Sequence, residues 1–362
     1  MPAPLRFDLS RDDPARARAA ALAALDRGEL VVVPTETVYG LAGREDRAQA
    51  LARLDAVKPG RDRPYSLAVG SADMVAERLA PWPRGARRIA ARWWPGPVTQ
   101  LLPDRSGQLL GVRVPGHPFT RELAQHAGAP LWLPSANSPG HPPPREVGDI
   151  EPAVLAAAAV VLDGGRAALG EASTVVEPRP LCLRVARVGV VGPEELVRHA
   201  GSLVLVVCTG NTCRSPMAER LLRRAIQQRA AAEPGLLPPS VRSAGVNADD
   251  GGPPTEQSVE ALAGLGLDLA DHSTRALRDP ELLAADLVLC MSAGHALAIE
   301  EHLAALGARA ERPVVDLFDP AGEDVADPFG TAVGQYVALA RILERMARVR
   351  AEQLLAPWRP LP

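Results

Sequence analysis

The chain of 362 residues is too long for one ordinary hydrophobic core, which predicts two domains. With 47% hydrophobic and 23% charged residues, both domains should be globular. Residues 1–200 hold 25 basic against 22 acidic residues, and residues 201–362 hold 15 against 21, so charge alone does not indicate nucleic-acid binding in either half.

The cysteine content and the first residues bear on the compartment. Four scattered cysteines are too few for a disulfide framework and fit a reducing cytoplasm. The opening sequence MPAPLRFD lacks the apolar core of a secretory signal, and no apolar run approaches a membrane span. We therefore expect a cytoplasmic protein with no membrane partner.

Two residue types are rare enough to be informative. Of 40 basic residues, Lys58 is the one lysine, and asparagine occurs only at positions 137, 211 and 247. Lysine and asparagine codons are poor in G and C, whereas the chain is rich in Ala, Arg, Gly and Pro. Such residues are expected where their chemistry is hard to replace.

The first elements lead to a polar turn. Asp13 and Pro14 predict the N-cap and first turn of a helix that ends at Gly28. Leu30–Val33 then predicts a buried strand, which runs into PTETVYGL at residues 34–41. By itself this polar stretch could be a structural cap or a ligand contact.

Downstream motifs favour a ligand contact. Lys58 lies in a loop rich in Gly, Pro and Arg, which suits polyphosphate because lysine acts as a mobile point charge and arginine as a fork. The segments that follow in order are WWPGPVT at 93–99, GVRVP at 111–115, PSANSPG at 134–140 and STVV at 173–176.

Residues 10–198 resemble the YrdC family of threonylcarbamoyl-AMP synthases, whose motifs appear here in the family's order. The resemblance implies a twisted, open α/β sheet that holds ATP and L-threonine on a concave face. It further implies condensation of threonine, bicarbonate and ATP to threonylcarbamoyl-adenylate, for modification of adenosine 37 in tRNA. The expected cofactor is Mg²⁺ with ATP, and catalysis would rest on positioning and charge neutralisation without a covalent nucleophile.

The family's functional residues can be placed on this chain. Thr35 and Tyr39 would contact threonine, and Arg113 would pair with its carboxylate. Phosphates would be held by Lys58 and by either Arg61 or Arg63, because the basic loop is longer than usual. The residues implied on the nucleotide side of the pocket are Ser135, Asn137, Ser173 and Arg187.

The chain also departs from the family. Residues 66–70 read SLAVG where many members have a histidine, and the extra C-terminal domain of longer relatives is absent. An alternative is therefore a non-catalytic module that binds nucleotide or RNA, including double-stranded RNA. Either reading leaves tRNA and the threonylcarbamoyl-transfer machinery as expected partners.

The second half begins at residue 201, after a short helix predicted at 193–199. Strands predicted at 204–208, 241–246, 285–291 and 313–317 alternate with helices, and the closing helix is expected at 334–355. Such alternation predicts a Rossmann-like parallel sheet with helices on both faces and an active loop at strand C-terminal ends.

The loop after the first of these strands carries chemistry. Cys208 is followed after five residues by Arg214, and Ser215-Pro216 opens a helix. Backbone N–H groups of such a loop and the helix dipole form an anion cradle, which Arg214 would close as a planar fork. The same positive field favours the thiolate of Cys208, a nucleophile.

This C-x5-R-S loop resembles the low-molecular-weight protein-tyrosine-phosphatase family over residues 202–355. The family also needs an acid in an Asp-Pro-aromatic motif, which Asp327-Pro328-Phe329 supplies. The resemblance implies that Cys208 attacks phosphorus in a phosphorylated protein and that Asp327 protonates the leaving group. Arg214 would bind oxygens, Ser215 would bond the thiolate and Asn211 would hold the loop, with no cofactor.

The substrate is indicated by Thr212, where tyrosine-directed members commonly have isoleucine. A threonine hydroxyl can bond a guanidinium, and the sequence VCTGNTCRSPMAE looks most like the bacterial branch that acts on protein phosphoarginine. We favour phosphoarginine over phosphotyrosine. Arsenate reductase is a third reading, which needs extra cysteines; Cys290, in an apolar strand, is the remaining one downstream.

Overall fold

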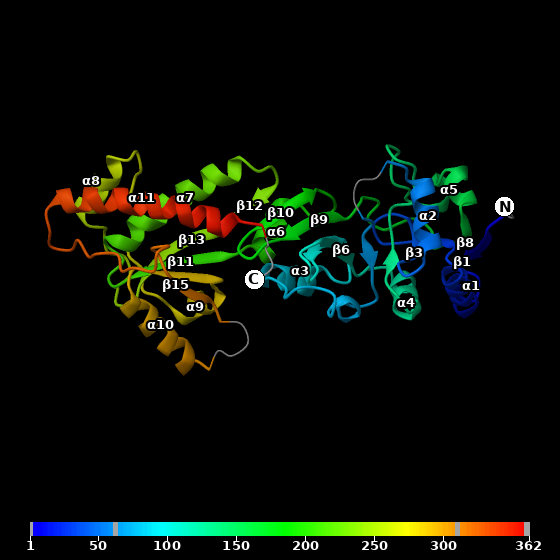
Figure 1. Ribbon diagram of the computed structural model, residues 1–362, viewed down its shortest axis with the longest axis horizontal. Coiled ribbons are helices and arrows are strands. Elements are labelled where there is room, and N and C mark those ends of the chain that lie inside the picture. Colours follow the sequence, from blue (N-terminus) through cyan, green and yellow to red (C-terminus); the bar gives the residue numbers. More distant parts are fainter. Residues whose placement is uncertain (1–2, 61–63, 308–311, 358–362) are drawn as a thin grey trace. The chain divides into compact units, whose positions relative to one another are not determined.

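The computed structural model describes residues 3–60, 64–307 and 312–357, and in it the chain forms two compact units (Figure 1). Within the described residues, unit 1 comprises 3–178 and 184–200, and unit 2 comprises 179–183 and 201–357. Among the described helices, none combines the length and apolar character needed to cross a membrane.

Unit 1 is built on a mixed sheet flanked by helices. Its helices are α1 (Pro14–Asp26), α2 (Ala48–Val57), α3 (Arg84–Trp93), α4 (Pro118–His126), α5 (Pro152–Ala156) and α6 (Pro193–Ala200), with 3-10 turns at Ala72–Val75 and Val147–Asp149. Its strands are β1 (Leu5–Asp8), β2 (Leu30–Val33), β3 (Gly40–Arg44), β4 (Leu67–Ala68), β5 (Val98–Pro103), β6 (Leu109–Arg113), β7 (Leu131–Trp132), β8 (Ala158–Asp163), β9 (Thr174–Pro178) and β10 (Leu183–Arg187).

The strands of unit 1 follow the order β1-β8-β2-β3-β7-β4-β6-β5-β9-β10. The sheet is mixed, with parallel pairs (β1 with β8, β2 with β8, β4 with β6, β5 with β9) and antiparallel pairs (β2 with β3, β3 with β7, β4 with β7, β5 with β6). The open α/β sheet expected from the sequence is confirmed.

The start of unit 1 shows why its sequence folds as predicted. The Asp13 carboxylate accepts the N–H of Ala15 at 2.9 Å and Pro14 occupies the first turn of α1, which ends before Gly28 at φ +69°. Strand β2 is buried throughout: Val31 and Val33 pack in one apolar cluster and Leu30 in another. Burial on both faces explains its unbroken apolar sequence.

Unit 2 contains a four-stranded parallel sheet in the order β13-β11-β14-β15. These strands are β11 (Leu203–Cys208), β13 (Ser240–Gly245), β14 (Leu287–Cys290) and β15 (Val314–Leu317), with a short β12 (Leu236–Leu237) outside this sheet. The helices are α7 (Arg214–Ala231), α8 (Glu256–Ala263), α9 (Asp279–Ala284), α10 (Ala293–Ala305) and α11 (Val333–Leu355).

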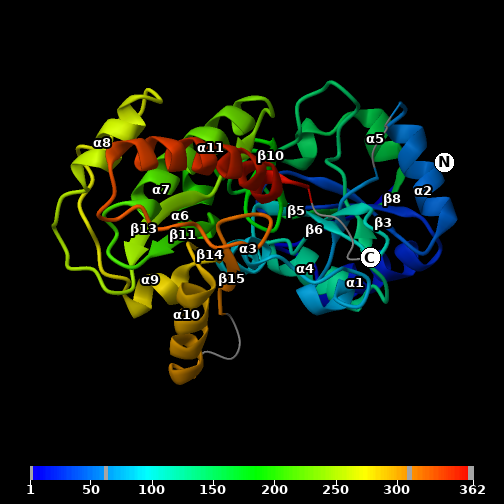
Figure 2. The same cartoon turned by 60° about the vertical axis from the view of Figure 1, so that its left-hand side comes forward.

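Both faces of this sheet are covered, as predicted. Val204 and Val206 of β11 pack in the core that α7, α8 and α11 share, whereas Leu205 and Val207 pack in a second core with α9 and α10. Helices α7 and α11 run side by side in Figures 1 and 2. Because β11 lies between two parallel neighbours, the loop after Cys208 opens at the C-terminal edge of the sheet.

Candidate active sites

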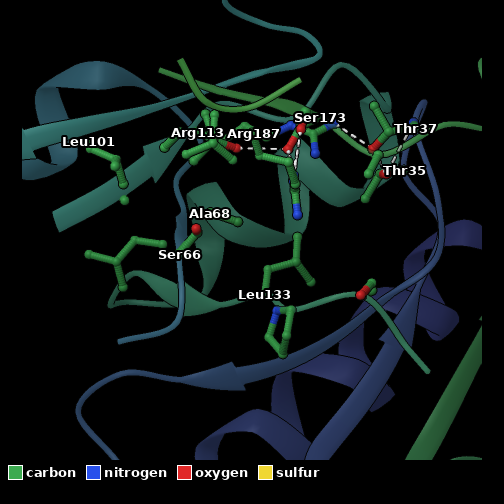
Figure 3. A pocket seen from close by; sticks show the side chains of 18 of the residues that line it. Thr35, Thr37, Ser66, Ala68, Leu101, Arg113, Leu133, Ser173 and Arg187 are labelled. Atoms are coloured by element: carbon green, nitrogen blue, oxygen red, sulfur yellow. Dashed lines mark hydrogen bonds between the residues drawn. The ribbon is translucent and has the colours of Figure 1, made fainter. Parts of the chain in front are cut away.

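Unit 1 contains a cavity of about 680 Å³ whose walls come from the PTETVYGL turn, β5, β6, β9 and β10. Arg113, Arg187 and Ser173 border the same cavity as Thr35 and Thr37 (Figure 3). The sequence-predicted residues on its wall are Thr35, Tyr39, Arg113, Ser135, Ser173 and Arg187. Segments far apart in the sequence therefore meet here.

Thr35 closes the turn after β2. Its hydroxyl donates to the carbonyl of Val38 at 2.6 Å and accepts the N–H groups of Thr37 and Val38. The hydroxyls of Thr35 and Thr37 are 2.9 Å apart. The threonines of the motif thus fold the turn by local side-chain bonds and present hydroxyls at the cavity.

Tyr39 borders the cavity, but its side chain is fully buried. Its hydroxyl donates to the carbonyl of Gly165 at 2.6 Å and accepts the N–H of Gly164 at 2.9 Å. Burial raises the pKa of Tyr39 to about 12. The phenol therefore ties the end of β8 to the turn.

Arg113, at the end of β6, carries positive charge to the cavity wall. Its Nη2 donates to Glu36 Oε1 at 2.6 Å and to Thr37 Oγ1 at 2.9 Å, and its Nε donates to the carbonyl of Gly96. Glu36 also accepts the N–H of His117 at 3.2 Å. Arg113 is thus held in place beside a carboxylate, in the arrangement that a ligand carboxylate could share.

Arg187 and Ser173 form a second polar group. Arg187 Nη2 donates to the carbonyl and hydroxyl of Ser173 at 2.7 and 3.1 Å, and the Ser173 hydroxyl lies 2.9 Å from that of Thr99. Arg187 belongs to β10, Thr99 to β5 and Ser173 to the segment just before β9, so two strands and this segment fix one cluster.

Lys58 and Asn137 are joined to each other. Lys58 Nζ donates to Asn137 Oδ1 at 2.9 Å, and the hydroxyl of Ser135, on the cavity wall, donates to the same oxygen at 2.6 Å. The lone lysine and one of three asparagines therefore meet although 79 residues separate them. Arg61 and Arg63 lie outside the described residues.

Some residues on the cavity wall were not predicted. Thr37 lies within the PTETVYGL motif and Thr99 within WWPGPVT, so the motifs held the signal for them. Glu177 and Arg184, paired at 3.4 Å across the hairpin of β9 and β10, also border the cavity. No motif in the sequence pointed to that pair.

In unit 2, a cavity of about 260 Å³ opens over the loop that follows β11. Cys208 is buried at the end of β11, and its Sγ lies 3.0 Å from the hydroxyl of Ser215 and 3.3 Å from the donating N–H of Asn211. Both contacts suit a thiolate. The residues that line the cavity are Cys208, Thr209, Gly210, Thr212, Cys213, Arg214, Asp327 and Phe329.

Asn211 holds the shape of this loop. Its backbone has φ +55°, a left-handed conformation that asparagine tolerates better than most residues. Its fully buried amide donates to the hydroxyls of Ser215 and Ser243, each at 2.9 Å, and accepts the N–H of Arg275 at 2.9 Å. The carbonyl of Asn211 accepts from His272 in addition.

Arg214 and Asp327 form an ion pair at the cavity. Arg214 Nη2 bonds Asp327 Oδ2, and its Nη1 donates to the carbonyl of Val325 at 3.2 Å. The arginine side chain is 8% exposed and the aspartate side chain 49%. An anion in the loop would compete with Asp327 for the guanidinium, which would free the carboxyl group above it.

Thr212 and Cys213 lie on the wall of the cavity. The Thr212 hydroxyl is 3.4 Å from Cys213 Sγ, which in turn lies 3.5 Å from the Thr255 hydroxyl and 3.6 Å from that of Tyr336. The carbonyl of Thr212 accepts the N–H of Thr255 at 3.1 Å. The N–H of Thr255, the N-cap of α8, thus fixes the backbone of Thr212, and the Thr255 and Tyr336 hydroxyls contact its neighbour Cys213.

The two cavities differ in kind: one is broad and polar with arginines on its wall, and the other opens over a loop that holds a buried cysteine beside an arginine. Comparisons with known proteins agree. Residues 23–189 match the Sua5/YciO/YrdC family model, described as telomere recombination. Residues 203–357 match the low molecular weight phosphotyrosine protein phosphatase model.

The chain therefore belongs to the threonylcarbamoyl-AMP synthase family through its first half and carries a low-molecular-weight phosphatase domain in its second. A threonylcarbamoyl-AMP synthase from Chromohalobacter salexigens is 40% identical over 168 residues, which is 43% of this chain and 89% of that protein. The synthase from Bacillus subtilis is 33% identical over 47% of this chain, which spans only 51% of that relative.

Parts of the chain are also similar to solved structures. The arginine phosphatase YwlE from Geobacillus stearothermophilus is 32% identical and covers 42% of this chain and 92% of its own, with a TM-score of 0.36. A Sua5 variant from Pyrococcus abyssi is 19% identical and covers 95% of this chain and 97% of its own, with a TM-score of 0.51. At that identity the second likeness concerns the fold alone.

Proposed function

We propose that the protein is a bifunctional enzyme whose domains divide at residues 200 and 201. The first domain makes L-threonylcarbamoyladenylate from L-threonine, bicarbonate and ATP, and the second is a cysteine-dependent protein phosphatase. The observation that carries the proposal is the meeting of family motif residues from distant segments at each cavity. The four cysteines, all buried, fit the cytoplasm that we propose as its compartment.

In the first domain, Arg113 would take the carboxylate of threonine, aided by the hydroxyls of Thr35 and Thr37. The group of Lys58, Asn137 and Ser135 would contact phosphates, and Ser173 with Arg187 would line the nucleotide side. Mg²⁺ would be held mainly by ATP oxygens and water, and would neutralise charge at the phosphates. Tyr39 would support the wall of the threonine pocket.

The chemistry of this domain rests on position. The threonine amine attacks the carbon of bicarbonate and water leaves, which gives a carbamate. An oxygen of this carbamate then attacks the α-phosphorus of ATP and pyrophosphate leaves. The cationic side chains of Lys58, Arg113 and Arg187 lower the cost of bringing these anions together. The product would pass to the tRNA threonylcarbamoyl-transfer machinery, which makes that machinery and tRNA the proposed partners.

The test is pyrophosphate release that depends on both ATP and threonine. Arg113→Gln should raise the KM for threonine at least tenfold with little change in the KM for ATP, because one charge-assisted pair is lost. Arg105→Gln, an exposed arginine, is the matched control. No release above background, together with salt-sensitive binding of tRNA or double-stranded RNA, would instead support a non-catalytic binding module.

In the second domain, the Cys208 thiolate attacks phosphorus and Asp327 gives its proton to the leaving group, which leaves a phosphocysteine. Water then attacks phosphorus, Asp327 takes the water proton, and the Cys208 thiolate departs as phosphate is released. Arg214 would exchange Asp327 for phosphate oxygens, and Ser215 would bond the thiolate in both steps. Asn211 would keep the loop N–H groups directed at the phosphate.

We further propose phosphoarginine as the substrate in preference to phosphotyrosine. Thr212 lies on the cavity wall and its hydroxyl can bond a guanidinium, which a branched alkyl side chain cannot do. The test compares kcat/KM on phosphoarginine and phosphotyrosine peptides, with Cys208→Ser as the blank. Thr212→Ile should reverse the preference, whereas Thr212→Ser, which keeps the hydroxyl, should retain it.

Arsenate reductase is the less supported function for this domain. That chemistry needs a second accessible thiol, and burial raises the pKa of Cys290 to about 12 within β14. Thiol-dependent arsenate reduction by the whole protein, abolished by Cys290→Ala, would support it over the phosphatase.

A further inference from the structure

A histidine outside the proposed mechanism contacts the phosphate loop of unit 2. His295 lies in the first turn of α10 and is 9% exposed. Its Nε2 is 2.9 Å from the hydroxyl of Thr209, the residue that follows Cys208, and its Nδ1 is 2.7 Å from the hydroxyl of Ser292. An imidazole therefore joins the start of the loop to the N-cap of a helix.

The start of α10 also contacts the loop that carries the acid. The Asp324 carboxylate accepts the N–H of Ala293 at 2.7 Å, and the N–H of Val325 donates to the carbonyl of Met291 at 2.8 Å. Asp327 follows two residues later. Both loops of the phosphatase site are thus fixed on the same helix end, with His295 between Thr209 and that end.

The contacts of His295 suit both of its protonation states. A neutral imidazole offers one donor and one acceptor, and each hydroxyl partner can take the complementary role. An imidazolium donates from both nitrogens, and a hydroxyl oxygen can accept each bond. Proton uptake would therefore break neither contact.

Burial and the neighbouring charges then determine whether the His295 ring is protonated. Burial lowers the pKa of His295 below its usual range and Arg214 lowers it further, whereas Asp327 and Asp324 act in the opposite direction. A dianion in the loop would add negative charge and would engage Arg214. Both effects favour the imidazolium.

We propose that His295 is a positioning residue that holds the phosphate loop at Thr209 and takes up a proton when a dianion fills the loop. This inference rests on the proposed phosphatase function of unit 2. Anion affinity would then rise as the pH falls through the range in which His295 titrates, because binding and proton uptake favour each other.

Sulfate is the probe for the test, since it stays a dianion across the useful pH range. Its Kd is measured on the full chain with Cys208→Ser, which removes the thiol, at pH 5.5 to 8. We expect affinity about fivefold tighter at pH 5.5 than at pH 8, and a variation below about twofold after His295→Gln. His302→Gln, on the exposed side of α10 beside Asp279, should behave like the parent.

Proton uptake is also measured directly. The imidazole signal of His295, assigned by its loss in His295→Gln, is titrated by NMR with and without saturating sulfate. We expect its midpoint to move to higher pH with sulfate, and Thr209→Val to reduce the movement. Should His295→Gln not fold, Thr209→Val, which removes one contact only, replaces it. The His295 signal is then identified by its changed chemical shift in Thr209→Val, and this variant serves for the comparison.

The outcomes separate the two proposals. Sulfate binding with the same pH dependence in the parent and His295→Gln, or an unmoved His295 midpoint, would overturn this inference and leave the phosphatase function intact. Absence of sulfate binding at every pH would overturn both.

Discussion

Replacement of Asn211 by alanine should strongly lower the free energy of unfolding of unit 2. The amide makes three hydrogen bonds at a site with no solvent exposure, and its loss leaves Ser243 and the Arg275 N–H without these bonds. A net loss of about 1 kcal/mol for each bond applies. Alanine in the left-handed backbone adds about 1 kcal/mol more, so we expect about 4 kcal/mol altogether.

Activity should fall as well, because the Asn211 N–H contacts Cys208 and its side chain contacts Ser215. Displacement of the loop by even about 1 Å would cost about 100-fold in kcat/KM. The loss of stability is measured by hydrogen exchange of the amides of β11 in unit 2, which gives the free energy of opening. Turnover is measured on a small aryl phosphate.

Two variants make this prediction sharp. Asn211→Gly removes the same bonds, but glycine adopts the left-handed backbone without strain in the native loop. This variant should therefore be less destabilised than Asn211→Ala. Asn247→Ala alters an exposed asparagine near the same loop and should stay within about 0.5 kcal/mol of the parent. A loss below about 1 kcal/mol for Asn211→Ala, with unchanged kcat/KM, would refute the reasoning.

Three further predictions concern buried polar groups. Gln100 on β5 is fully buried, and neither atom of its amide has a hydrogen-bond partner. Gln100→Leu should therefore stabilise unit 1 by about 1–3 kcal/mol. The measurement is urea unfolding followed through tryptophan fluorescence, and equal or lower stability would contradict this prediction. Tyr39→Phe strands the N–H of Gly164 and should destabilise the same unit by a similar amount in the same assay. Burial lowers the pKa of His272 below its ordinary 6.5, so the unfolded state binds the proton first as the pH falls. Unit 2 should therefore lose stability below about pH 6.5. Hydrogen exchange should show a smaller loss for His272→Gln, and an equal loss would exclude His272 as the cause.

Many local elements of the structure could be predicted from the sequence, because they depend on interactions between residues that are close in the chain. The Asp13 cap, the apolar run of β2 and the strand that ends at Cys208 were each predictable, because caps, periodicity and motif spacing act over a few residues. Composition alone also marked Lys58 and Asn137 as unusual. The sequence could not say that these two side chains bond each other.

The tertiary structure decided the partners. Arg113 pairs with Glu36 across 77 positions of the sequence. Arg214 meets Asp327 because β11 and β15, which precede their loops, are parallel and end at the same edge of a sheet. The contact between His295 and Thr209 spans 86 residues and follows no motif. Side chains that are distant in sequence meet only after the sheet sets strand order and register, so the sequence determined which groups were present and packing determined which of them share a site.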